Sequence, residues 1–367
     1  MLFDERPKEN IEDLYDRNRE LKLLIKLIRE CKPLILILGL RRTGKTSLLK
    51  VALNQLNLPH IVIDCRVFEE NISISYNDII RVFEKALNNL VRRRRKIINF
   101  LKSIKAINIA GLEIKFTHMF KRRISLIEVF EKLNEYCESE NQCMVIAFDE
   151  AQELAKARGI RFLPIIAYSY DNFPRLTFIF TGSKIGLLYR FLKIDDPKSP
   201  IYGRVRHEIF LKNFTREMSL DFLRKGFREA NMMVDEKILE KAVEKLDGIV
   251  GWLTYFGSLS IQYKASEKII QRVLEEGSRI VLNELENFFR IRYIARKRYQ
   301  LILKRIAIEN ASWIEIKDYI EVKDRPISDS NLALLLNNLI DAGFIEKKDK
   351  IYRITDPVLK YAVNKYF

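Results

Sequence analysis

The stretch LILILGLRRTGKT occupies residues 34–46 and decides the fold. Its first five residues are all apolar, which is typical of a β-strand buried on both faces. The last eight residues fit the pattern G-x-x-x-x-G-K-[ST], and apolar residues at helical spacing continue to Leu56. A strand, this loop and a helix in succession are the setting in which the pattern binds the phosphates of a nucleoside triphosphate.

Each part of the loop has a physical task in such a site. Successive backbone N–H groups surround the phosphates, helped by the positive end of the helix dipole. We expect the Lys45 ammonium to contact the β- and γ-phosphates and to act in catalysis, and the Thr46 hydroxyl to hold Mg²⁺. The expected nucleotide contacts along the loop are Gly39, Leu40, Arg41, Arg42, Thr43, Gly44, Lys45, Thr46 and Ser47.

A second apolar strand, residues 144–148, ends in the adjacent acids Asp149 and Glu150. Two carboxylates at the tip of a buried strand indicate that a cation lies next to them. We expect Asp149 to hold Mg²⁺ through its water shell and Glu150 to orient or deprotonate the attacking water. The alternative is a solvated pair of acids at the start of a helix, which the helix dipole would favour.

Four further residues are candidates for a role near the γ-phosphate. Thr181 and Ser183 follow the apolar strand 176–180, and Gln152 follows the acids; a simple turn with a helix cap is the alternative for the first two. Arg204 precedes the expected strand 205–211 and is a candidate for stabilising the transition state, from its own chain or from a neighbour. An exposed surface arginine is the alternative interpretation of Arg204.

The apolar strands alternate with amphipathic helices, which predicts a mostly parallel α/β sheet flanked by helices, the P-loop NTPase class. Residues 1–212 form the expected nucleotide-binding domain, with a basic insert at about 91–123 and a short hairpin over 107–116. Residues 213–290 carry only helical patterns and are expected to form a lid domain. Residues 291–367 end in two short strands after three helices, which predicts a winged-helix domain.

Charge is the strongest signal of the composition. The chain has 367 residues and a formal net charge of +16, and residues 81–125 contain 13 basic and 2 acidic side chains. Such an excess favours a polyanionic partner, although a lysine-rich solvated surface is an equal alternative. The four cysteines show no metal-ligand spacing and are expected to be unpaired, buried side chains in a reducing cytosol. With no signal peptide and no apolar run of membrane-spanning length, the expected location is cytoplasmic.

Taken together, these motifs resemble the archaeal ATPase family, a branch of the STAND NTPases related to the AAA+ group. The matching elements are D-R-x-x-E-L at residues 16–21, the double arginine before T-G-K-T-S, D-E-A-Q at 149–152, T-G-S at 181–183, Y-G-R at 202–204 and D-P-V at 356–358. The resemblance implies that Asp16 and Arg17 lie near the adenine. It also implies a lid element G-x-P-G-W that touches the nucleotide. Here Val250 stands where the family has proline, which puts this lid contact in doubt.

The function expected from these features is a slow, Mg²⁺-dependent ATPase that binds ATP and ADP and acts as a conformational switch for the winged-helix domain. The alternative is a nucleic-acid-binding ATPase, replication-initiator-like or transposition-type, that contacts mainly the DNA backbone. The stretch from Arg290 to Arg305 supports it with seven basic residues and no acid. The predicted recognition helix, 329–341, argues against base reading because it contains no Lys or Arg.

Other partners and classes stay open or are less favoured. The basic insert and the winged helix are also candidates for binding a protein partner, and oligomerisation is compatible with the sequence. A non-hydrolysing scaffold does not explain the pair Asp149 and Glu150. A small-molecule kinase does not explain the lid and the winged helix. The absence of an N-K-x-D guanine motif favours ATP over GTP.

Overall fold

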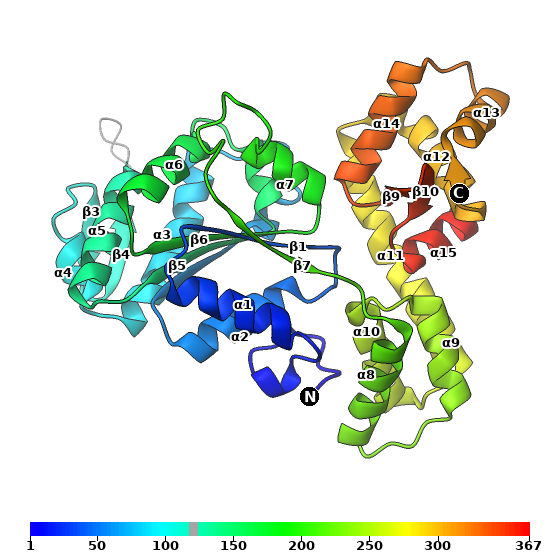
Figure 1. The fold of residues 1–367 in the computed structure, drawn as a ribbon, viewed down its shortest axis with the longest axis horizontal. Helices are drawn as coiled ribbons and strands as arrows, with labels where there is room; N and C mark the ends of the chain where they lie inside the picture. Colours follow the sequence, from blue (N-terminus) through cyan, green and yellow to red (C-terminus); the bar gives the residue numbers. More distant parts are fainter. Residues whose placement is uncertain (117–123) are drawn as a thin grey trace.

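The computed structural model describes residues 1–116 and 124–367. Its centre is a sheet of five parallel strands in the order β2-β5-β6-β1-β7 (Figure 1). The strands are β1 (Leu34–Gly39), β2 (His60–Asp64), β5 (Met144–Asp149), β6 (Leu176–Gly182) and β7 (His207–Leu211). The predicted P-loop NTPase fold is confirmed: the strands predicted over 34–38, 144–148, 176–180 and 205–211 are present, and so is the strand that the apolar run 61–63 predicts.

Alternate residues of each strand feed two separate hydrophobic cores, as the period of two dictates. Ile35 and Ile37 of β1 pack under helices α1 (Asn18–Arg29) and α2 (Lys45–Leu56) on one face. Leu34, Leu36 and Leu38 pack on the other face. That face is covered by α3 (Tyr76–Arg93), α5 (Leu126–Ser139), α6 (Phe162–Asn172) and α7 (Ile185–Leu192). Strands such as β1 are apolar along their whole length because helices cover both faces of the sheet.

The insert extends α3 beyond the edge strand β2. It contains the short helix α4 (Ile97–Leu101) and the hairpin of β3 (Ile107–Ala110) and β4 (Glu113–Phe116), as predicted. Side chains of α3 hold the hairpin: Asn88 exchanges two hydrogen bonds with the backbone of Ile114, at 2.7 and 2.8 Å. Glu84 accepts a bond from the Phe116 N–H at 2.6 Å. Residues 117–123 of the predicted insert lie outside the described residues.

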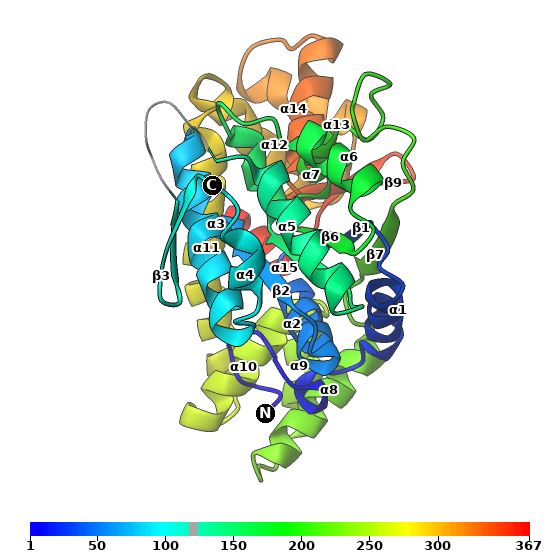
Figure 2. The ribbon, with the colours of Figure 1, turned by 90° about the vertical axis from the view of Figure 1, so that its left-hand side faces the viewer.

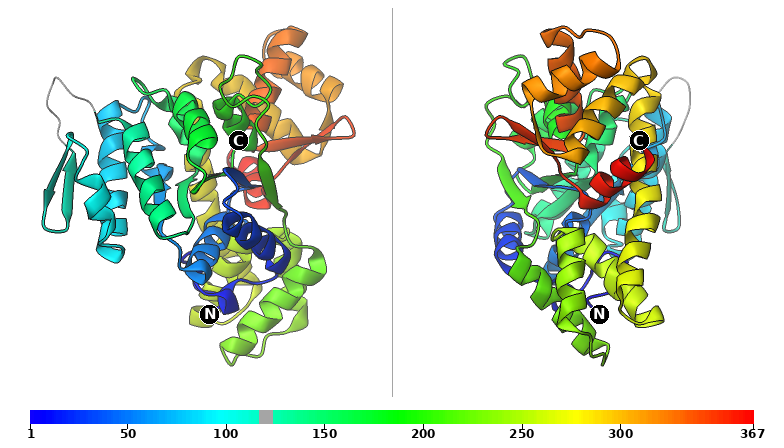
Figure 3. Two further views of the ribbon diagram at one scale, coloured as in Figure 1. Left: turned by 60° about the vertical axis from the view of Figure 1, so that its left-hand side comes forward. Right: turned by 90° about the vertical axis from the view of Figure 1, so that its right-hand side faces the viewer.

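The lid consists of α8 (Arg216–Glu229), α9 (Glu236–Leu246), α10 (Val250–Tyr263) and the 24-residue α11 (Glu267–Arg290). Helix α11 runs on into the winged-helix domain, and the two domains share one hydrophobic core. The amino terminus lies beside the lid (Figure 3), where the Phe3 ring occupies space left by two glycines, Gly226 of α8 and Gly257 of α10. Residues 1–10 therefore tie the start of the chain to the lid, which the sequence patterns did not predict.

The winged-helix domain follows the predicted order of helices and hairpin. Its elements are α12 (Arg296–Ile308), α13 (Trp313–Lys323), α14 (Asp329–Asp341), β9 (Ile345–Lys348) and β10 (Ile351–Ile354). Two elements were not predicted: the short strand β8 (Ala311–Ser312), which pairs with β10, and the final helix α15 (Pro357–Tyr366). Four 3₁₀ segments complete the described chain: Ile11–Asp13, Cys65–Phe68, Ala151–Lys156 and Tyr293–Ala295.

The expectation of four unpaired cysteines is wrong for one pair. Cys31, just after α1, and Cys143, just before β5, form a disulfide with their Cα atoms 5.6 Å apart. The sequence gave no sign of it because 112 positions separate the two residues, and the sheet brings them together. Cys65 and Cys137 are free and buried, as expected. Within the described ranges, no helix is long and apolar enough to cross a membrane.

Candidate nucleotide-binding site

The P-loop connects β1 to α2 at the carboxyl edge of the sheet. Gly44 precedes α2 with φ of 93°, a left-handed conformation that glycine adopts without the steric cost of a Cβ atom. The Lys45 ammonium is buried and turned back into the loop. It donates hydrogen bonds to the carbonyl oxygens of Gly39, at 3.0 Å, and Leu40, at 2.8 Å. Burial lowers the pKa of Lys45, opposed by the charges of Glu150 and Asp149.

The predicted magnesium ligands are brought together. The Thr46 hydroxyl donates to Asp149 Oδ2 at 2.8 Å, and the Thr181 hydroxyl donates to Asp149 Oδ1. Burial raises the pKa of Asp149, and the two hydroxyl bonds oppose that rise. A buried carboxylate that has only hydroxyl partners fits a hard cation, which would neutralise its charge. The residues therefore fit Mg²⁺, with Thr46 and Asp149 as ligands and the remaining positions left to phosphate and water.

Glu150 is fixed in an unusual conformation beside them. Its φ is 53°, in the left-handed region that non-glycine residues seldom adopt, so the surrounding contacts must stabilise it. The carboxylate accepts hydrogen bonds from the Ser183 hydroxyl and from Gln152 Nε2, the latter at 2.7 Å, and lies 3.8 Å from the Lys45 ammonium. Burial alone would raise the pKa of Glu150, but Lys45, Ser183 and Gln152 lower it to about 2.

Thr181, Ser183 and Gln152 thus reach the site through the acids. The Thr181 hydroxyl also accepts a bond from the Glu150 backbone N–H at 3.0 Å, so it holds the Asp149 carboxylate and the Glu150 backbone. The Oε1 atom of Gln152 is buried and has no hydrogen-bond partner among the described residues. Such an orphaned acceptor is costly unless a ligand or water satisfies it. The three predicted residues therefore lie where they can respond to a group bound at the acids.

A cavity of about 590 Å³ opens in front of the loop. The loop from Arg41 to Ser47, the acid Glu150, Arg17 and the lid residues Val250 to Trp252 line it. The amino-terminal segment closes one side, where the Lys8 backbone N–H donates to the Ser47 hydroxyl at 3.0 Å. The volume and the buried, polar floor suit a nucleotide between the sheet and the lid.

The two residues expected near the adenine differ in their placement. Arg17 is buried under the loop, where it donates to the Lys212 carbonyl at 2.7 Å and lies over the Phe214 ring at 4.9 Å. Asp16 is exposed and does not line the cavity described above. The structure therefore brings Arg17 to the site but not Asp16, because the chain reverses direction there with an Asp16 φ of 47°.

The double arginine, expected to contact the nucleotide, is engaged in ion pairs with acids that line the same cavity. Arg41 forms ion pairs with Glu69 and with Glu284 of α11, the latter at 2.7 Å. Arg42 pairs with the same Glu284 at 2.7 Å and with Asp356 at 3.7 Å, and lies over the Trp252 ring at 4.3 Å. Their side chains therefore connect the loop to the lid and to the winged-helix domain, and their contact with a nucleotide stays a prediction.

The lid touches the loop despite valine at position 250. The Gly251 N–H donates to the Arg42 carbonyl at 3.0 Å, and a Cβ atom at position 251 would lie only 2.6 Å from Arg42 Cβ. Glycine is therefore required for this approach. The Trp252 indole N–H donates to the Asp356 carboxylate at 3.1 Å. The lid therefore contacts the loop, whereas its contact with the nucleotide stays a prediction.

Arg204 lies elsewhere. It precedes β7 and is therefore near the amino edge of the sheet, whereas the P-loop is at the carboxyl edge. Its guanidinium pairs with Asp171, near the end of α6, and lies 5.7 Å from the Tyr170 ring centre. The structure does not bring Arg204 to the loop of its own chain, because the length of a strand separates them. A role at a neighbour's nucleotide stays a prediction.

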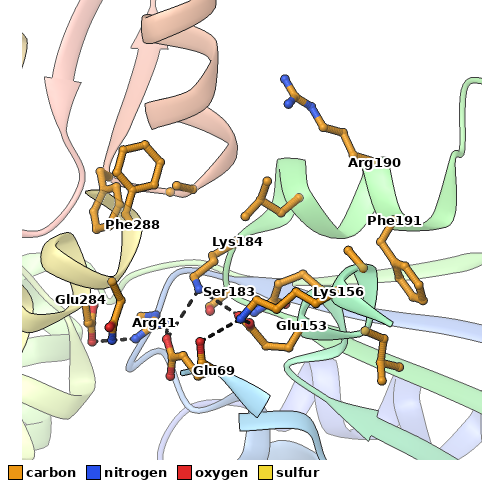
Figure 4. A pocket seen from close by; sticks show the side chains of 18 of the residues that line it. Arg41, Glu69, Glu153, Lys156, Ser183, Lys184, Arg190, Phe191, Glu284 and Phe288 are labelled. Atoms are coloured by element: carbon orange, nitrogen blue, oxygen red, sulfur yellow. Dashed lines mark hydrogen bonds and ion pairs between the residues drawn. The ribbon is translucent and has the colours of Figure 1, made fainter. Parts of the chain in front are cut away.

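A second cavity, of about 740 Å³, lies on the far side of Arg41 and Glu284, between the carboxyl edge of the sheet, α11 and the winged helix (Figure 4). Lys184 and Lys156 share the buried carboxylate of Glu153 there. Sequence reasoning missed Glu69, Glu153 and Glu284, which neutralise the basic residues of this wall. Of the acids that pair with basic residues around the loop, only Asp356 belongs to a recognised motif, D-P-V, and that motif did not indicate its role.

Comparisons with known proteins agree with this geometry. The profile of a family described as an ATPase domain predominantly from Archaea matches residues 14–256, and that of the MCM protein C-terminal winged helix-turn-helix domain matches 293–355. A Walker-type ATPase of Pyrococcus abyssi is 39% identical, with 99% of each chain covered and a TM-score of 0.84. The Aeropyrum pernix ORC2 protein, solved as ADPNP–ADP complexes, shares the fold at 12% identity, with 99% of this chain and 96% of that chain covered and a TM-score of 0.60. No curated protein matches.

Proposed function

The chain belongs to the family of ATPase domains found predominantly in Archaea, and on this premise we propose that it is a Mg²⁺-dependent ATPase whose nucleotide state positions the winged-helix domain. The observation that carries the proposal is the position of Arg42. One side chain of the P-loop contacts the lid through Glu284 and Trp252 and the winged helix through Asp356. Any shift of the loop on binding phosphate is therefore passed to both domains.

The proposed chemistry uses the groups around the loop. Mg²⁺, held by Thr46 and Asp149, supplies positive charge to the β- and γ-phosphate oxygens when bound. Lys45 leaves its carbonyl partners and contacts the γ-phosphate. Glu150 accepts a proton from the attacking water or orients it. Because Glu150 is held by Ser183, Gln152 and Lys45 before nucleotide binds, its release is an extra step, which supports slow turnover.

A second connection supports the switch. Helix α7 follows Thr181 and Ser183 in the chain, and its Arg190 pairs with Asp341 at the end of α14. A Cβ atom on Gly186 of α7 would overlap Asp341, so the two helices approach closely. A change at the acids thus has a direct path through α7 to the winged helix. Two contacts with discrete partners are the physical basis that a two-state switch needs.

The hydrolytic part is tested by the variant Glu150→Gln. We expect a loss of hydrolysis of at least about 100-fold, the range of general-base catalysis, with ATP binding retained. The rate of phosphate release, with Mg²⁺ present and with the metal chelated, measures hydrolysis. Calorimetric titration with ATP measures binding. Hydrolysis at the parent rate in Glu150→Gln would remove Glu150 from its assigned role.

The switch is tested by a distance measurement between spin labels on Asn89→Cys of α3 and Ser330→Cys of α14, both exposed positions. We expect the distance to differ between ADP and a non-hydrolysable ATP analogue, and the difference to disappear in Glu284→Gln. If the distance between the labels is the same in every nucleotide state, the protein is an ATPase whose nucleotide does not move the winged-helix domain.

An assembly is the one setting in which Arg204 can act on ATP. Its role then requires a neighbouring chain that presents the amino edge of its sheet to the cavity. Specific ATPase activity that rises with protein concentration and is lost in Arg204→Ala supports this arrangement. Concentration-independent activity, unchanged in Arg204→Ala, rejects it.

A nucleic-acid-binding ATPase is the second candidate function. The charge excess and the match to an MCM winged-helix profile favour it. Its contacts are expected to be with the phosphate backbone, because helix α14 carries no Lys or Arg.

A further inference from the structure

The winged helix is poorly equipped to hold a polyanion. Helix α14 turns four leucines, Leu332, Leu335, Leu336 and Leu339, into the core and presents Asp, Ser and Asn residues outside. A helix that enters a groove of DNA normally supplies Lys or Arg to phosphates and bases. The element expected to bind DNA in this type of domain therefore lacks the necessary charge.

The seven basic residues from Arg290 to Arg305 are also largely neutralised. Lys297 and Arg298 share Asp324, at 2.6 and 3.2 Å. Arg296 pairs with Glu286 at 2.5 Å and Arg305 with Glu315 at 2.8 Å. An exposed pair contributes little stability, but it cancels the local charge that would attract phosphate. Four of the seven basic residues of this stretch are therefore paired with acids, and Arg290, Arg292 and Lys304 donate to backbone carbonyls.

The insert differs from α14 and from the stretch 290–305 because most of its basic side chains have no acid partner. Residues 81–116 contain ten basic and two acidic side chains. One of the two acids, Glu84, is taken up by the Phe116 backbone N–H, and the other, Glu113, pairs with Lys115 at 3.6 Å. Seven of the basic side chains are exposed and form no ion pair with an acid among the described residues: Arg81, Lys85, Arg92, Arg93, Arg95, Lys102 and Lys105.

Three of these residues form a line, which we call the α3 stripe: Arg81, Lys85 and Arg92. Spacings of four and seven residues put them on one face of α3, with the exposed Asn89 between them. The stripe is about 16 Å long at 1.5 Å per residue. One strand of DNA carries a phosphate about every 3.4 Å along the helix axis, so the stripe covers about five phosphates.

The local potential is positive at the end of α3. Arg93 and Arg94 lie beside His60, where burial lowers the pKa of the imidazole and the two guanidinium charges lower it further. Figure 2 shows α3 and α4 on the side of the molecule opposite the winged helix, where neither the lid nor the winged helix covers them. A ligand as long as a duplex can therefore reach the stripe while ATP occupies its cavity.

We propose that the α3 stripe binds the phosphate backbone of nucleic acid, and that the winged helix does not. The inference rests on the second candidate function and not on the switch. A membrane surface is less suited, because docking on a bilayer needs exposed bulky apolar groups next to the charge. Among the described residues of 76–116, Leu112 is the one large apolar side chain that is exposed, at 37%.

The test compares two triple variants of the full chain that remove the same charge. One is Arg81→Gln/Lys85→Gln/Arg92→Gln in the stripe, and the other is Lys347→Gln/Lys348→Gln/Lys350→Gln on the wing. Anisotropy of a fluorescein-labelled 30-base-pair duplex, from 50 to 300 mM NaCl, gives affinity and its salt dependence. We expect the stripe variant to bind at least about tenfold more weakly and its logarithmic salt slope to fall by about two to three, with the wing variant unchanged.

The remaining outcomes overturn the proposal. Loss of affinity in the wing variant alone assigns binding to the winged helix. A parent chain whose duplex binding ignores salt, or that binds phosphatidylserine vesicles but not duplex, has no nucleic-acid site at the stripe. Both variants lie outside the ATP cavity, so parent-level ATPase activity shows that they are folded and keeps a failure here separate from a failure of the proposed ATPase.

Discussion

Lys45 and Arg42 belong to the same loop, three residues apart, and face opposite sides of it. Lys45 is 4% exposed and directed at two backbone carbonyls and at Glu150, inside the phosphate-binding curve. Arg42 is directed outward, at Glu284, Trp252 and Asp356. The inner side chain recognises a ligand, and the outer one holds two other domains.

The difference between Lys45 and Arg42 shows how a single loop can bind phosphate with one side chain and contact two other domains with another. An ammonium on a flexible stem suits a phosphate, whereas the planar guanidinium can pair with two carboxylates and lie flat on an indole at the same time. The acids on the two sides are separate, so each side can be disturbed without the other.

The largest effect is expected inside the loop. Lys45→Ala removes the ammonium expected to contact the phosphates, and we expect ATP binding to weaken about 1000-fold, equivalent to about 4 kcal/mol of binding free energy. Calorimetric titration measures it. Lys50→Ala, one turn further along α2 and paired with Glu9 at the surface, is the matched control and keeps parent affinity. ATP affinity in Lys45→Ala equal to that of the control would mean that the inner side of the loop does not bind phosphate.

The second effect lies at the opposite edge of the sheet, away from both sides of the loop. The double variant Cys31→Ser/Cys143→Ser removes a link across 112 positions, and we expect it to lower the free energy of unfolding by about 3 kcal/mol. Nucleotide affinity stays unchanged. Denaturant unfolding measures the loss; dithiothreitol should lower the stability of the parent and leave the variant unaffected. If dithiothreitol lowers the stability of the parent and of the variant equally, the disulfide is not the cause of the lost stability.

The third effect tests the outer side. Arg42→Ala breaks the pair with Asp356 and the stacking on Trp252, and we expect a loss of about 1 to 2 kcal/mol in unfolding free energy. A cycle with Asp356→Asn should give a coupling of about 1 kcal/mol. Arg190→Ala is the control, since it breaks the other contact with the winged helix without touching the loop. Additive losses in the cycle would show that Arg42 and Asp356 are not coupled.

The smallest effect is in the pH dependence of the inner side. The folded pKa of Glu150 is about 2 and its reference value is 4.5, so its ionised form stabilises the fold above pH 4.5 and this contribution is lost as the pH falls toward 2. Between pH 6 and pH 4 the loss amounts to about 1 kcal/mol. Asp149, whose pKa is raised, acts with the opposite sign. Unfolding of the parent and of Glu150→Gln at several pH values measures the difference in slope; parallel curves would place the pKa of Glu150 near its ordinary value.

The fold was predictable because its signals are local. Five apolar strands, the glycines of the P-loop and the helical periods are properties of short segments, and each was found where the structure has it. The pairing of Thr46 with Asp149 followed from one rule, that the carboxyl ends of parallel strands meet at one edge. Helix α15 was missed although Asp356 and Pro357 form a typical helix start, with the carboxylate accepting from the Val358 N–H at 2.8 Å.

Side-chain direction was not predictable in the same way. Arg41 and Arg42 belong to a phosphate-binding motif, so the motif alone suggested that they contact phosphate. Their partners Glu284 and Asp356 are more than 200 positions away, and no local pattern marks an acid on a long helix as the partner of a loop. Arg204 does not reach the loop of its own chain because it precedes β7, which runs parallel to β1, and its role at a neighbour's nucleotide stays a prediction.

The sequence by itself determined a P-loop fold with a lid and a winged helix, and the chemical groups of the site: Lys45, Thr46, Asp149 and Glu150. Backbone geometry and apolar periodicity act over a few residues, so they can be read without the fold. Only the tertiary structure decided which charges are neutralised. Four of the five basic residues of α12 and the double arginine meet acids of other segments, whereas the residues of the α3 stripe meet none among the described residues. Coulomb interactions depend on distance in space, and the sequence does not contain that distance.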